Sequence, residues 1–218
     1  MERPRVGIVI PALNEGRTIA AVVGQAVQFG KPVVVDDGST DETARLAADA
    51  GADVVRLETN RGYDRALDAG FARAAELGCE YIITMDADGQ HNPTLLSEFV
   101  RLLDAGADVV VGVRDRRQRF AERVFALYGK LRFGIDDPLC GMKAYRVGVY
   151  RSLGHFDSYG SIGTELALFA ARQRLKVRQT AVKTRDRVDA PRFGRAMLAN
   201  WRILRALFRD VFAQHARR

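Results

Sequence analysis

The hydrophobic residues of this chain fall into short continuous runs that are separated by helical patterns. Runs rich in valine and isoleucine predict five strands, at Val6–Ile10, Val33–Val35, Val54–Leu57, Tyr81–Met85 and Val109–Val113. Between them, apolar residues repeat at helical spacing and predict helices at about 15–29, 41–50, 63–77 and 93–105. Continuous apolar runs indicate strands that are buried on both faces, as in a mainly parallel sheet flanked by helices. The pattern therefore predicts a doubly wound, Rossmann-like α/β fold with ligands at the carboxyl ends of the strands.

The alternation of strands and helices ends after Val113. Residues 114–133 are basic and amphipathic, and residues 136–146 are rich in turn residues and lead to a strand. A helix at 164–174 and a strand at 176–183 follow. A long amphipathic helix is predicted at 193–214, where the apolar residues at helical spacing are Met197, Trp201, Leu204, Phe208 and Val211. This apolar face either closes the core or lies on a membrane surface.

Composition narrows the class of protein and the kind of partner. The net charge of +7 suggests an anionic partner: nucleic acid, a membrane surface or a phosphorylated small molecule. No run approaches the roughly 18 apolar residues that span a bilayer, and the first residues do not resemble a signal peptide. Two cysteines are too few for a disulfide framework. We expect a single cytoplasmic domain, either free or peripheral at the cytoplasmic face of a membrane.

Polar residues follow several predicted strands directly. Pro11-Ala12-Leu13-Asn14-Glu15 follows the first, Asp36-Asp37-Gly38-Ser39-Thr40 the second, and Asp86-Ala87-Asp88-Gly89-Gln90 the fourth. In a parallel sheet these segments meet at one edge, where clustered carboxylates raise one another's pKa unless a cation lies among them. Carboxylate and amide oxygens suit Mg²⁺ or Mn²⁺, which normally take their remaining ligands from water and substrate phosphate. The cluster indicates a metal-bound diphosphate.

The same features are compatible with other classes of protein, which further residues argue against. An isolated Asp-x-Asp is more often a turn or a helix cap than a metal site, and its place at the end of a buried strand favours the metal here. A nicotinamide-dependent dehydrogenase requires a Gly-x-Gly-x-x-Gly turn after the first strand, which this chain lacks. A nucleic-acid-binding module would need a recognisable motif or stacking aromatic residues among the arginines, and none is present.

These segments, in this order and spacing, resemble glycosyltransferase family 2, whose members have the GT-A fold. The resemblance covers about residues 5–195 and includes Asn60-Arg61-Gly62 and Gly112-Val113-Arg114. The form of the Asp86-Ala87-Asp88 segment, with Asp137-Pro138-Leu139-Cys140-Gly141 further on, most resembles the dolichol- and polyprenyl-phosphate sugar transferases. The resemblance implies one domain, with a nucleotide-sugar-binding half at 1–113 and an acceptor-side half at 114–218.

The resemblance also implies roles for particular residues. The wall around the nucleotide's base and ribose would be formed by Pro11, Leu13, Glu15, Val35 and Asp37. Asp86 and Ala87 would lie against the nucleotide sugar, and the metal would be held by Asp86, Asp88 and Gln90. Phosphate charge would be neutralised by Arg114, Arg187 and Arg192, because a guanidinium pairs with phosphate oxygens at two points. Tyrosine is frequent in the family where Leu13 stands, so ring stacking on the base is lost.

The implied reaction is metal-dependent transfer of a sugar from a UDP- or GDP-linked donor, with inversion at the anomeric carbon. Metal and arginines would stabilise the charge that develops on the departing nucleoside diphosphate. A lipid monophosphate acceptor is already an anion at neutral pH, whereas a hydroxyl acceptor must lose a proton. Asp137 is the predicted catalytic base or acceptor-orienting carboxylate, and Glu165 is a second candidate near the acceptor.

The acceptor remains the open point. The acceptor class that the resemblance implies is a polyprenyl phosphate, but the chain lacks the Ser-Lys that often ends the motif matched by Arg187–Gly194. The alternatives are the same donor chemistry on a saccharide or protein hydroxyl, and a non-catalytic scaffold. Many relatives continue into transmembrane helices, so a lipid acceptor would require docking through residues 114–133 and the last helix, or through a membrane-protein partner.

Overall fold

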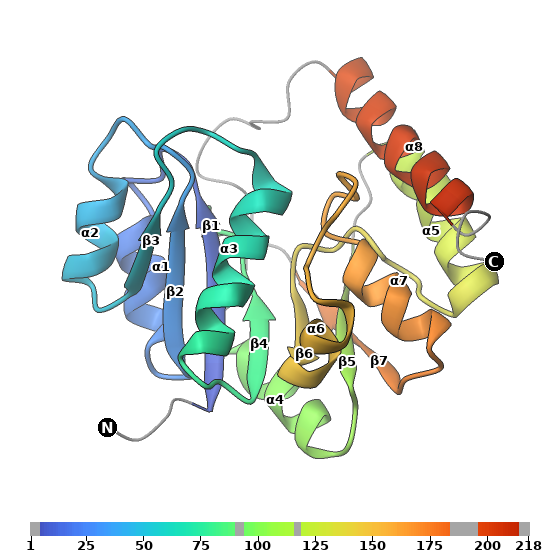
Figure 1. Cartoon of the computed structure of the whole chain (residues 1–218), viewed down its shortest axis with the longest axis horizontal. Coiled ribbons are helices and arrows are strands. Elements are labelled where there is room, and N and C mark those ends of the chain that lie inside the picture. The colour runs from blue at the N-terminus through green and yellow to red at the C-terminus, as the bar shows by residue number, and fades with distance from the viewer. Residues whose placement is uncertain (1–4, 90–93, 116–118, 184–195, 214–218) are drawn as a thin grey trace.

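The computed structural model describes residues 5–89, 94–115, 119–183 and 196–213. Within these ranges one sheet of seven strands runs through the molecule in the order β3-β2-β1-β4-β6-β5-β7 (Figure 1). The strands are β1 (Val6–Ala12), β2 (Lys31–Asp36), β3 (Asp53–Arg56), β4 (Tyr81–Thr84), β5 (Val109–Arg114), β6 (Lys143–Arg146) and β7 (Val177–Val182). The five predicted valine-rich runs all form strands, as does the predicted run near residues 176–183.

Helices cover both faces of the sheet, because most of its strands are apolar on both sides. The helices are α1 (Ile19–Ala26), α2 (Thr43–Asp49), α3 (Tyr63–Glu76), α4 (Leu95–Asp104), α5 (Phe120–Phe133), α6 (Val147–Leu153), α7 (Glu165–Arg172) and α8 (Ala196–Ala213). One apolar core lies between the sheet and α1, α2 and α4. A second core joins the opposite face to α3, α5, α6, α7 and α8. This is the layered α/β architecture that the sequence predicts.

Strand β6 is the antiparallel element of the otherwise parallel sheet. It pairs with β4 on one side, where Thr84 faces Lys143, and with β5 on the other, where Val111 faces Lys143. The turn-rich segment before β6 brings the chain back along the sheet in the reverse direction. Segment 137–142 therefore lies at the same edge as the carboxyl ends of β4 and β5, which places it in the candidate site.

Helix α6 is absent from the sequence-based prediction. Its first residues, Val147-Gly148-Val149, combine β-branched side chains with glycine, which are poor helix formers in isolation. Val149 is buried against the core, and Gly154 ends the helix in the left-handed conformation with φ of 83°. Tertiary packing and the glycine at the end thus stabilise a helix that local propensity disfavours.

Helix α8 packs on the core through only part of the apolar stripe expected from the sequence, since Leu204 lies against the core. Ile203 and Ala206 are buried beside α5, whereas Trp201 and Phe208, both in the predicted stripe, are 57% and 62% exposed. Of the two interpretations of the stripe, packing on the core holds for Leu204 but not for Trp201 and Phe208, and the inward face also includes a buried carboxylate, Asp210. None of the helices in the described part of the chain is both long and apolar enough to cross a bilayer.

Candidate active site

The end of β1 is held against the end of β2 by a set of local hydrogen bonds. Pro11 pairs with Val35 across the two strands, and Ser39 Oγ accepts a hydrogen bond of 2.8 Å from the Asn14 backbone N–H. The Glu15 backbone N–H donates to Thr43 Oγ1 at 2.8 Å, so the segment after β1 is tied to the start of α2. Asn14 can take its positive φ of 50° because asparagine tolerates the left-handed region.

The predicted nucleotide wall is only partly at the surface. Pro11 and Leu13 are half-buried, and the side chain of Glu15 is buried beside Thr18, whose hydroxyl lies 3.2 Å from its carboxylate. Val35 has no exposed surface, and a Cβ at Gly70 of α3 would lie 3.0 Å from one of its methyl groups. The structure thus places Val35 in the core, on the strand beside Pro11, and not at the surface of the predicted wall.

Asp37 organises the next loop of this edge. Its Oδ1 accepts a hydrogen bond of 2.7 Å from the Arg61 backbone N–H, and its Oδ2 accepts one of 2.8 Å from Gly62. These contacts fix the segment that precedes α3. An open cavity of about 470 Å³ lies beside this aspartate and is lined by Gly38, Ser39, Thr40, Arg56, Leu57 and Glu58. Asp37 therefore shapes the loop next to a hollow large enough for a small ligand.

The acidic segment begins two residues after β4. Asp86 is half-buried, Ala87 is buried, and Asp88 is 9% exposed. Gly141, which precedes β6, approaches Asp86 so closely that a Cβ there would lie 2.5 Å from Asp86 Oδ2. Because residue 141 is glycine, no side chain there clashes with the carboxylate of Asp86 at the edge of the sheet.

Tyr63, at the start of α3, also contacts this segment. Its hydroxyl lies 3.5 Å from Asp86 Oδ1. Burial, together with the negative charge of Asp86, raises the pKa of Tyr63 well above its ordinary value. The phenol is therefore a neutral donor directed at a carboxylate. Sequence reasoning missed Tyr63, although its place directly after Asn60-Arg61-Gly62 was a usable signal.

Arg114 and Asp137, predicted for phosphate binding and for acid–base chemistry, are paired with each other. Arg114 Nε lies 2.8 Å from Asp137 Oδ2 and its Nη2 lies 2.9 Å from Oδ1, while the Arg114 backbone N–H also donates to Oδ2 at 3.1 Å. Asp137 is 1% exposed. Burial opposes the charge on Arg114, but the hydrogen bonds and charge of Asp137 outweigh it and raise the pKa of the guanidinium. The structure thus orients Arg114 through Asp137.

Lys143 is a buried cation in the same region that sequence reasoning missed. Its ammonium donates to the carbonyl of Cys140 at 2.6 Å and to the carbonyl of Gly163 at 3.0 Å. Burial lowers its pKa, and the charges of Asp137 and Asp86 act in the opposite direction. Burial and the charge of Asp137 raise the pKa of the neighbouring Cys140 thiol to about 11. Lys143 therefore joins segment 137–142 to the start of α7.

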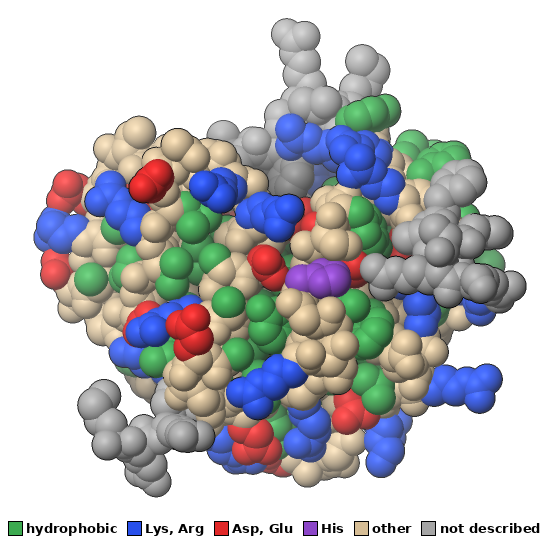
Figure 2. Space-filling view, viewed as in Figure 1, with side chains coloured by type: hydrophobic (Ala, Val, Ile, Leu, Met, Phe, Trp, Pro, Cys, Tyr) green, Lys and Arg blue, Asp and Glu red, His purple; other side chains and the backbone are tan. Residues whose placement is uncertain are grey.

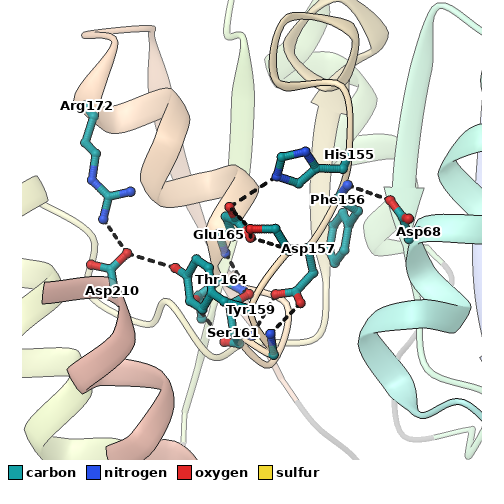
Figure 3. Close-up of polar contacts among 12 residues, drawn as sticks. Asp68, His155, Phe156, Asp157, Tyr159, Ser161, Thr164, Glu165, Arg172 and Asp210 are labelled. Atoms are coloured by element: carbon teal, nitrogen blue, oxygen red, sulfur yellow. Dashed lines mark hydrogen bonds and ion pairs between the residues drawn. The ribbon is translucent and has the colours of Figure 1, made fainter. Parts of the chain in front are cut away.

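The loop before α7 is held by carboxylates that accept its backbone N–H groups (Figure 3). Glu165, at the start of α7, accepts hydrogen bonds from Ser158 N–H at 2.6 Å and Ser158 Oγ at 2.8 Å, and lies 3.2 Å from His155 Nε2. Asp157 accepts from Gly160 and Ser161, each at 2.7 Å. The Glu165 side chain, predicted near the acceptor, thus stabilises this loop, and it is 4% exposed.

Helix α3 contributes two more carboxylates to the same loop. Asp68 accepts a hydrogen bond of 2.7 Å from Phe156 N–H, and Asp64 accepts one of 2.6 Å from Gly163 N–H (Figure 3 shows Asp68). Ile162 has a φ of 56°, a rare conformation for a β-branched residue. The surrounding hydrogen bonds hold this strained backbone beside Gly163, whose carbonyl contacts Lys143.

Three predicted site residues, Gln90, Arg187 and Arg192, lie outside the described residues. Within the described ranges no three His, Cys, Asp or Glu side chains gather as a metal-binding group. The donors that are described, Asp86 and Asp88, are hard carboxylate oxygens on one segment, and Gly141 has no side chain that would displace Asp86. Two carboxylates with phosphate and water completing the sphere fit Mg²⁺ or Mn²⁺ chemistry.

The chain belongs to the family described as Glycosyl transferase family 2, whose profile matches residues 7–153. It is 34% identical over 164 residues to polyprenol monophosphomannose synthase of Mycolicibacterium smegmatis, covering 65% of this chain and 62% of that protein. It is 30% identical over 192 residues to an undecaprenyl-phosphate 4-deoxy-4-formamido-L-arabinose transferase of Pectobacterium carotovorum, covering 79% of this chain and 58% of that protein. The chain therefore spans about three fifths of these two relatives, and it is a family 2 glycosyltransferase.

Solved structures confirm the GT-A fold. Glucosyl-3-phosphoglycerate synthase from Mycobacterium tuberculosis, in complex with Mn²⁺, uridine diphosphate and glucosyl-3-phosphoglycerate, is similar with a TM-score of 0.75 and 23% identity. The match covers 94% of this chain and 79% of that chain. The same enzyme in complex with Mg²⁺ and uridine diphosphate gives a TM-score of 0.68 at 24% identity, over 85% and 72% of the two chains.

Proposed function

We propose that this glycosyltransferase moves a sugar from a UDP- or GDP-linked donor to a polyprenyl phosphate, with a divalent metal and with inversion at the anomeric carbon. The proposal rests mainly on one observation: the carboxylates of Asp86 and Asp88 and the Arg114–Asp137 ion pair of segment 137–142 lie at the same edge of the sheet. Relatives named for polyprenyl and undecaprenyl phosphate support the acceptor class, and a similar fold that binds Mn²⁺ and uridine diphosphate supports the donor class.

The donor would occupy the edge formed by the ends of β1, β2 and β4. Pro11, Leu13 and Glu15 would line the base and ribose, with Val35 supporting Pro11 from the core. Asp37, whose oxygens each accept one backbone N–H, retains lone pairs that could accept a ribose hydroxyl or a base N–H. Asp86 and Ala87 would lie against the sugar and diphosphate.

Asp86, Asp88 and Gln90 would hold Mg²⁺ or Mn²⁺, which when bound supplies positive charge to the diphosphate leaving group. Arg114 would add a second positive charge there, and Asp137 fixes the direction of its guanidinium. Arg187 and Arg192 remain predicted phosphate contacts. Positively charged groups accelerate the reaction when they stabilise negative charge that develops only in the transition state.

A phosphate acceptor suits the state of Asp137. Both of its oxygens are hydrogen-bonded to Arg114, so it is better placed to orient than to remove a proton. A lipid monophosphate has its second pKa near about 6 and attacks as an anion without a base. We therefore assign Asp137 the role of orienting Arg114. A general base would be required only if the acceptor were a hydroxyl group.

The experiment has two stages. Thermal shifts with uridine and guanosine diphosphates, with and without Mn²⁺, test the donor site, and a ligand at about a hundred times its Kd adds about 2.7 kcal/mol, or roughly 5–10 °C in a domain this size. A metal-dependent shift with one nucleotide supports the donor site and identifies the base. Asp88→Ala should remove the shift without lowering the melting temperature of the free protein.

The second stage identifies the acceptor. The labelled sugar donor chosen by the first stage is incubated with polyprenyl phosphate or with saccharide and peptide acceptors, and the product is partitioned between organic solvent and water. Label in the organic phase supports the lipid acceptor. Label confined to water-soluble products would replace it with a hydroxyl acceptor, and nucleotide binding without transfer to any acceptor would indicate a scaffold.

A further inference from the structure

Helices α5 and α8 together present most of the exposed large hydrophobic side chains of the described chain. Five of the six such residues lie on these two helices: Phe120 (72% exposed), Leu127 (58%), Leu131 (78%), Trp201 (57%) and Phe208 (62%). On α5 these residues recur at helical spacing, and the two helices pack against each other through their opposite sides. We call the outward side of this helix pair the α5–α8 face.

The other exposed side chains in the described parts of these helices are basic. They are Arg123, Lys130 and Arg132 on α5, and Arg202, Arg205 and Arg209 in the described part of α8. Each helix has one carboxylate, and both point inward: Glu122 is 5% exposed and Asp210 is fully buried. Figure 2 shows hydrophobic and basic side chains gathered side by side at the upper right, over α8 as drawn in Figure 1.

We infer that the α5–α8 face docks on an anionic lipid bilayer. Large apolar side chains between cations, without exposed carboxylates, are the composition of a helix that lies in the interface between headgroups and acyl chains. Arginine and lysine can extend to anionic headgroups while leucine, phenylalanine and tryptophan enter the acyl boundary. The Arg205 guanidinium lies 5.4 Å from the centre of the Trp201 ring, so apolar and cationic groups already lie together.

The charge of the face argues against a second copy of this chain as its occupant. A two-fold dimer would bring six cations of one copy against the same six of the other, without exposed carboxylates on either helix to pair with them. Like charges in a desolvated interface oppose association. An anionic surface has the complementary charge.

The buried side of α8 makes the face a preformed surface. Asp210 accepts a hydrogen bond of 2.8 Å from Tyr128 of α5. It also accepts one of 3.0 Å from Tyr159 and is paired with Arg172 of α7 (Figure 3). These contacts fix α8 against α5 and α7. The exposed apolar residues are thus held outward without a change in the fold.

The position of α5 connects the face to the site. Helix α5 lies in the segment between Arg114 and Asp137, whose side chains form the ion pair at the edge of the sheet. A bilayer on the α5–α8 face would therefore lie beside the end of β5. The inference rests on the proposed function and extends it, because a bilayer bound at this face would bring a lipid-phosphate acceptor close to the site. Binding to lipid can nevertheless be measured without donor, metal or acceptor.

The test is flotation of the full chain with phosphatidylcholine vesicles, with or without about 30% phosphatidylglycerol, at low and high salt. We expect binding to the anionic vesicles that weakens with salt. The variant L127S/L131S/F208S should lower the partition coefficient about tenfold or more, because it removes apolar side chains that enter the bilayer. Val27→Ser, at a 43% exposed valine outside these helices, is the matched control and should bind like the parent.

A second pair of variants tests the charge. Arg123→Gln with Arg202→Gln should lower partitioning to anionic vesicles about tenfold or more, whereas Arg151→Gln with Arg178→Gln, two exposed arginines elsewhere, should change it about twofold or less. Absence of parent binding at low salt, or equal binding by all variants, would overturn the inference. So would a dimer in light scattering that only the α5–α8 variants convert to a monomer. Nucleotide thermal shifts without vesicles report separately on the proposed function.

Discussion

Asp137 and Arg114, 23 residues apart in sequence, form a two-point ion pair at the end of β5. The pair closes the segment that contains α5 and brings a guanidinium to the edge where the acidic segment after β4 also lies. Planar pairing of this kind fixes the orientation of an arginine more firmly than a single contact does. Asp137 therefore orients the guanidinium of Arg114, and Arg114 compensates the buried charge of Asp137.

Asp137→Asn should weaken both stability and transfer. Loss of one partner of a buried ion pair destabilises by about 3 kcal/mol, and a misdirected guanidinium should lower kcat/KM about tenfold to a hundredfold. The shape of the pH–rate profile should not change, because no base is removed. Urea unfolding and steady-state kinetics measure these effects.

Asp136→Asn is the control for that substitution. Asp136 is the neighbouring aspartate, 39% exposed in its side chain and paired with Lys130, so its loss should change stability by about 1 kcal/mol or less. If Asp137→Asn abolished one limb of the pH–rate profile, Asp137 would be a general base instead of an orienting residue.

Gly141→Ala should disturb donor binding more than folding. The added Cβ would lie 2.5 Å from Asp86 Oδ2, so the carboxylate must move away from its position. We expect the metal-dependent thermal shift with nucleotide to fall by about half or more, since a displaced ligand weakens metal binding. Unfolding of the free protein should change little, because a side-chain end can shift at small cost.

Gly148→Ala, in α6, is the matched glycine variant. No atom lies within 4 Å of its added Cβ, and alanine favours a helix by about 0.5–1 kcal/mol over glycine. Its nucleotide response should equal that of the parent. An unchanged response in Gly141→Ala as well would place the metal away from Asp86.

Asp210→Ala should release α8 from the body of the protein. The substitution leaves the hydroxyls of Tyr128 and Tyr159 and the guanidinium of Arg172 without their shared acceptor, and removal of one partner of such a buried network costs about 3 kcal/mol. Hydrogen exchange should speed up in α8 and in the loop around Tyr159, ahead of the strands.

Asp104→Ala provides the comparison at the surface. Asp104 also accepts from a tyrosine, Tyr81, at 2.9 Å and is also paired with an arginine, Arg5, but its side chain is 40% exposed. We expect a loss of about 1 kcal/mol or less there. Equal losses in the two variants would mean that burial of Asp210 adds nothing to the anchoring of α8.

Asp64 should make stability depend on pH between about 4 and 6. Burial, with the charge of Asp157, raises the pKa of Asp64 from 3.8 to about 6. The folded protein then binds a proton more tightly than the unfolded chain, so this contribution is fully present below the unfolded pKa and is lost as pH rises through about 6. The unfolding free energy of the parent, relative to Asp64→Asn, should therefore fall across this interval.

The Asp64 titration can be observed directly by carbon NMR of its carboxyl group. Asp157→Asn should lower the midpoint, because it removes a nearby negative charge, while burial keeps it above the ordinary value. A midpoint near the ordinary aspartate pKa in the parent would contradict this account of the loop before α7.

Local pattern was enough to predict the strands of the N-terminal half of the sheet. Valine-rich runs are readable because a strand buried on both faces needs continuous apolar residues, and Asp86 and Asp88 could be placed at the end of β4 because they follow such a run directly. Helix ends were displaced by several residues, as at α1, which begins at Ile19 although the pattern allowed residue 15. Periodicity does not mark where the last hydrogen-bonded turn begins.

The arrangement of residues 114–213 depended on contacts between residues far apart in the chain. The sequence alone determined an α/β sheet with an acidic edge and the family to which the chain belongs, because strand periodicity and motif spacing are local properties. Only the tertiary structure decided that Asp137 pairs with Arg114, that Lys143 is buried between two carbonyls, and that Asp210 turns α8 so that Trp201 and Phe208 face outward. A buried charge is stable only with its partners, and those partners come together only when the chain has folded.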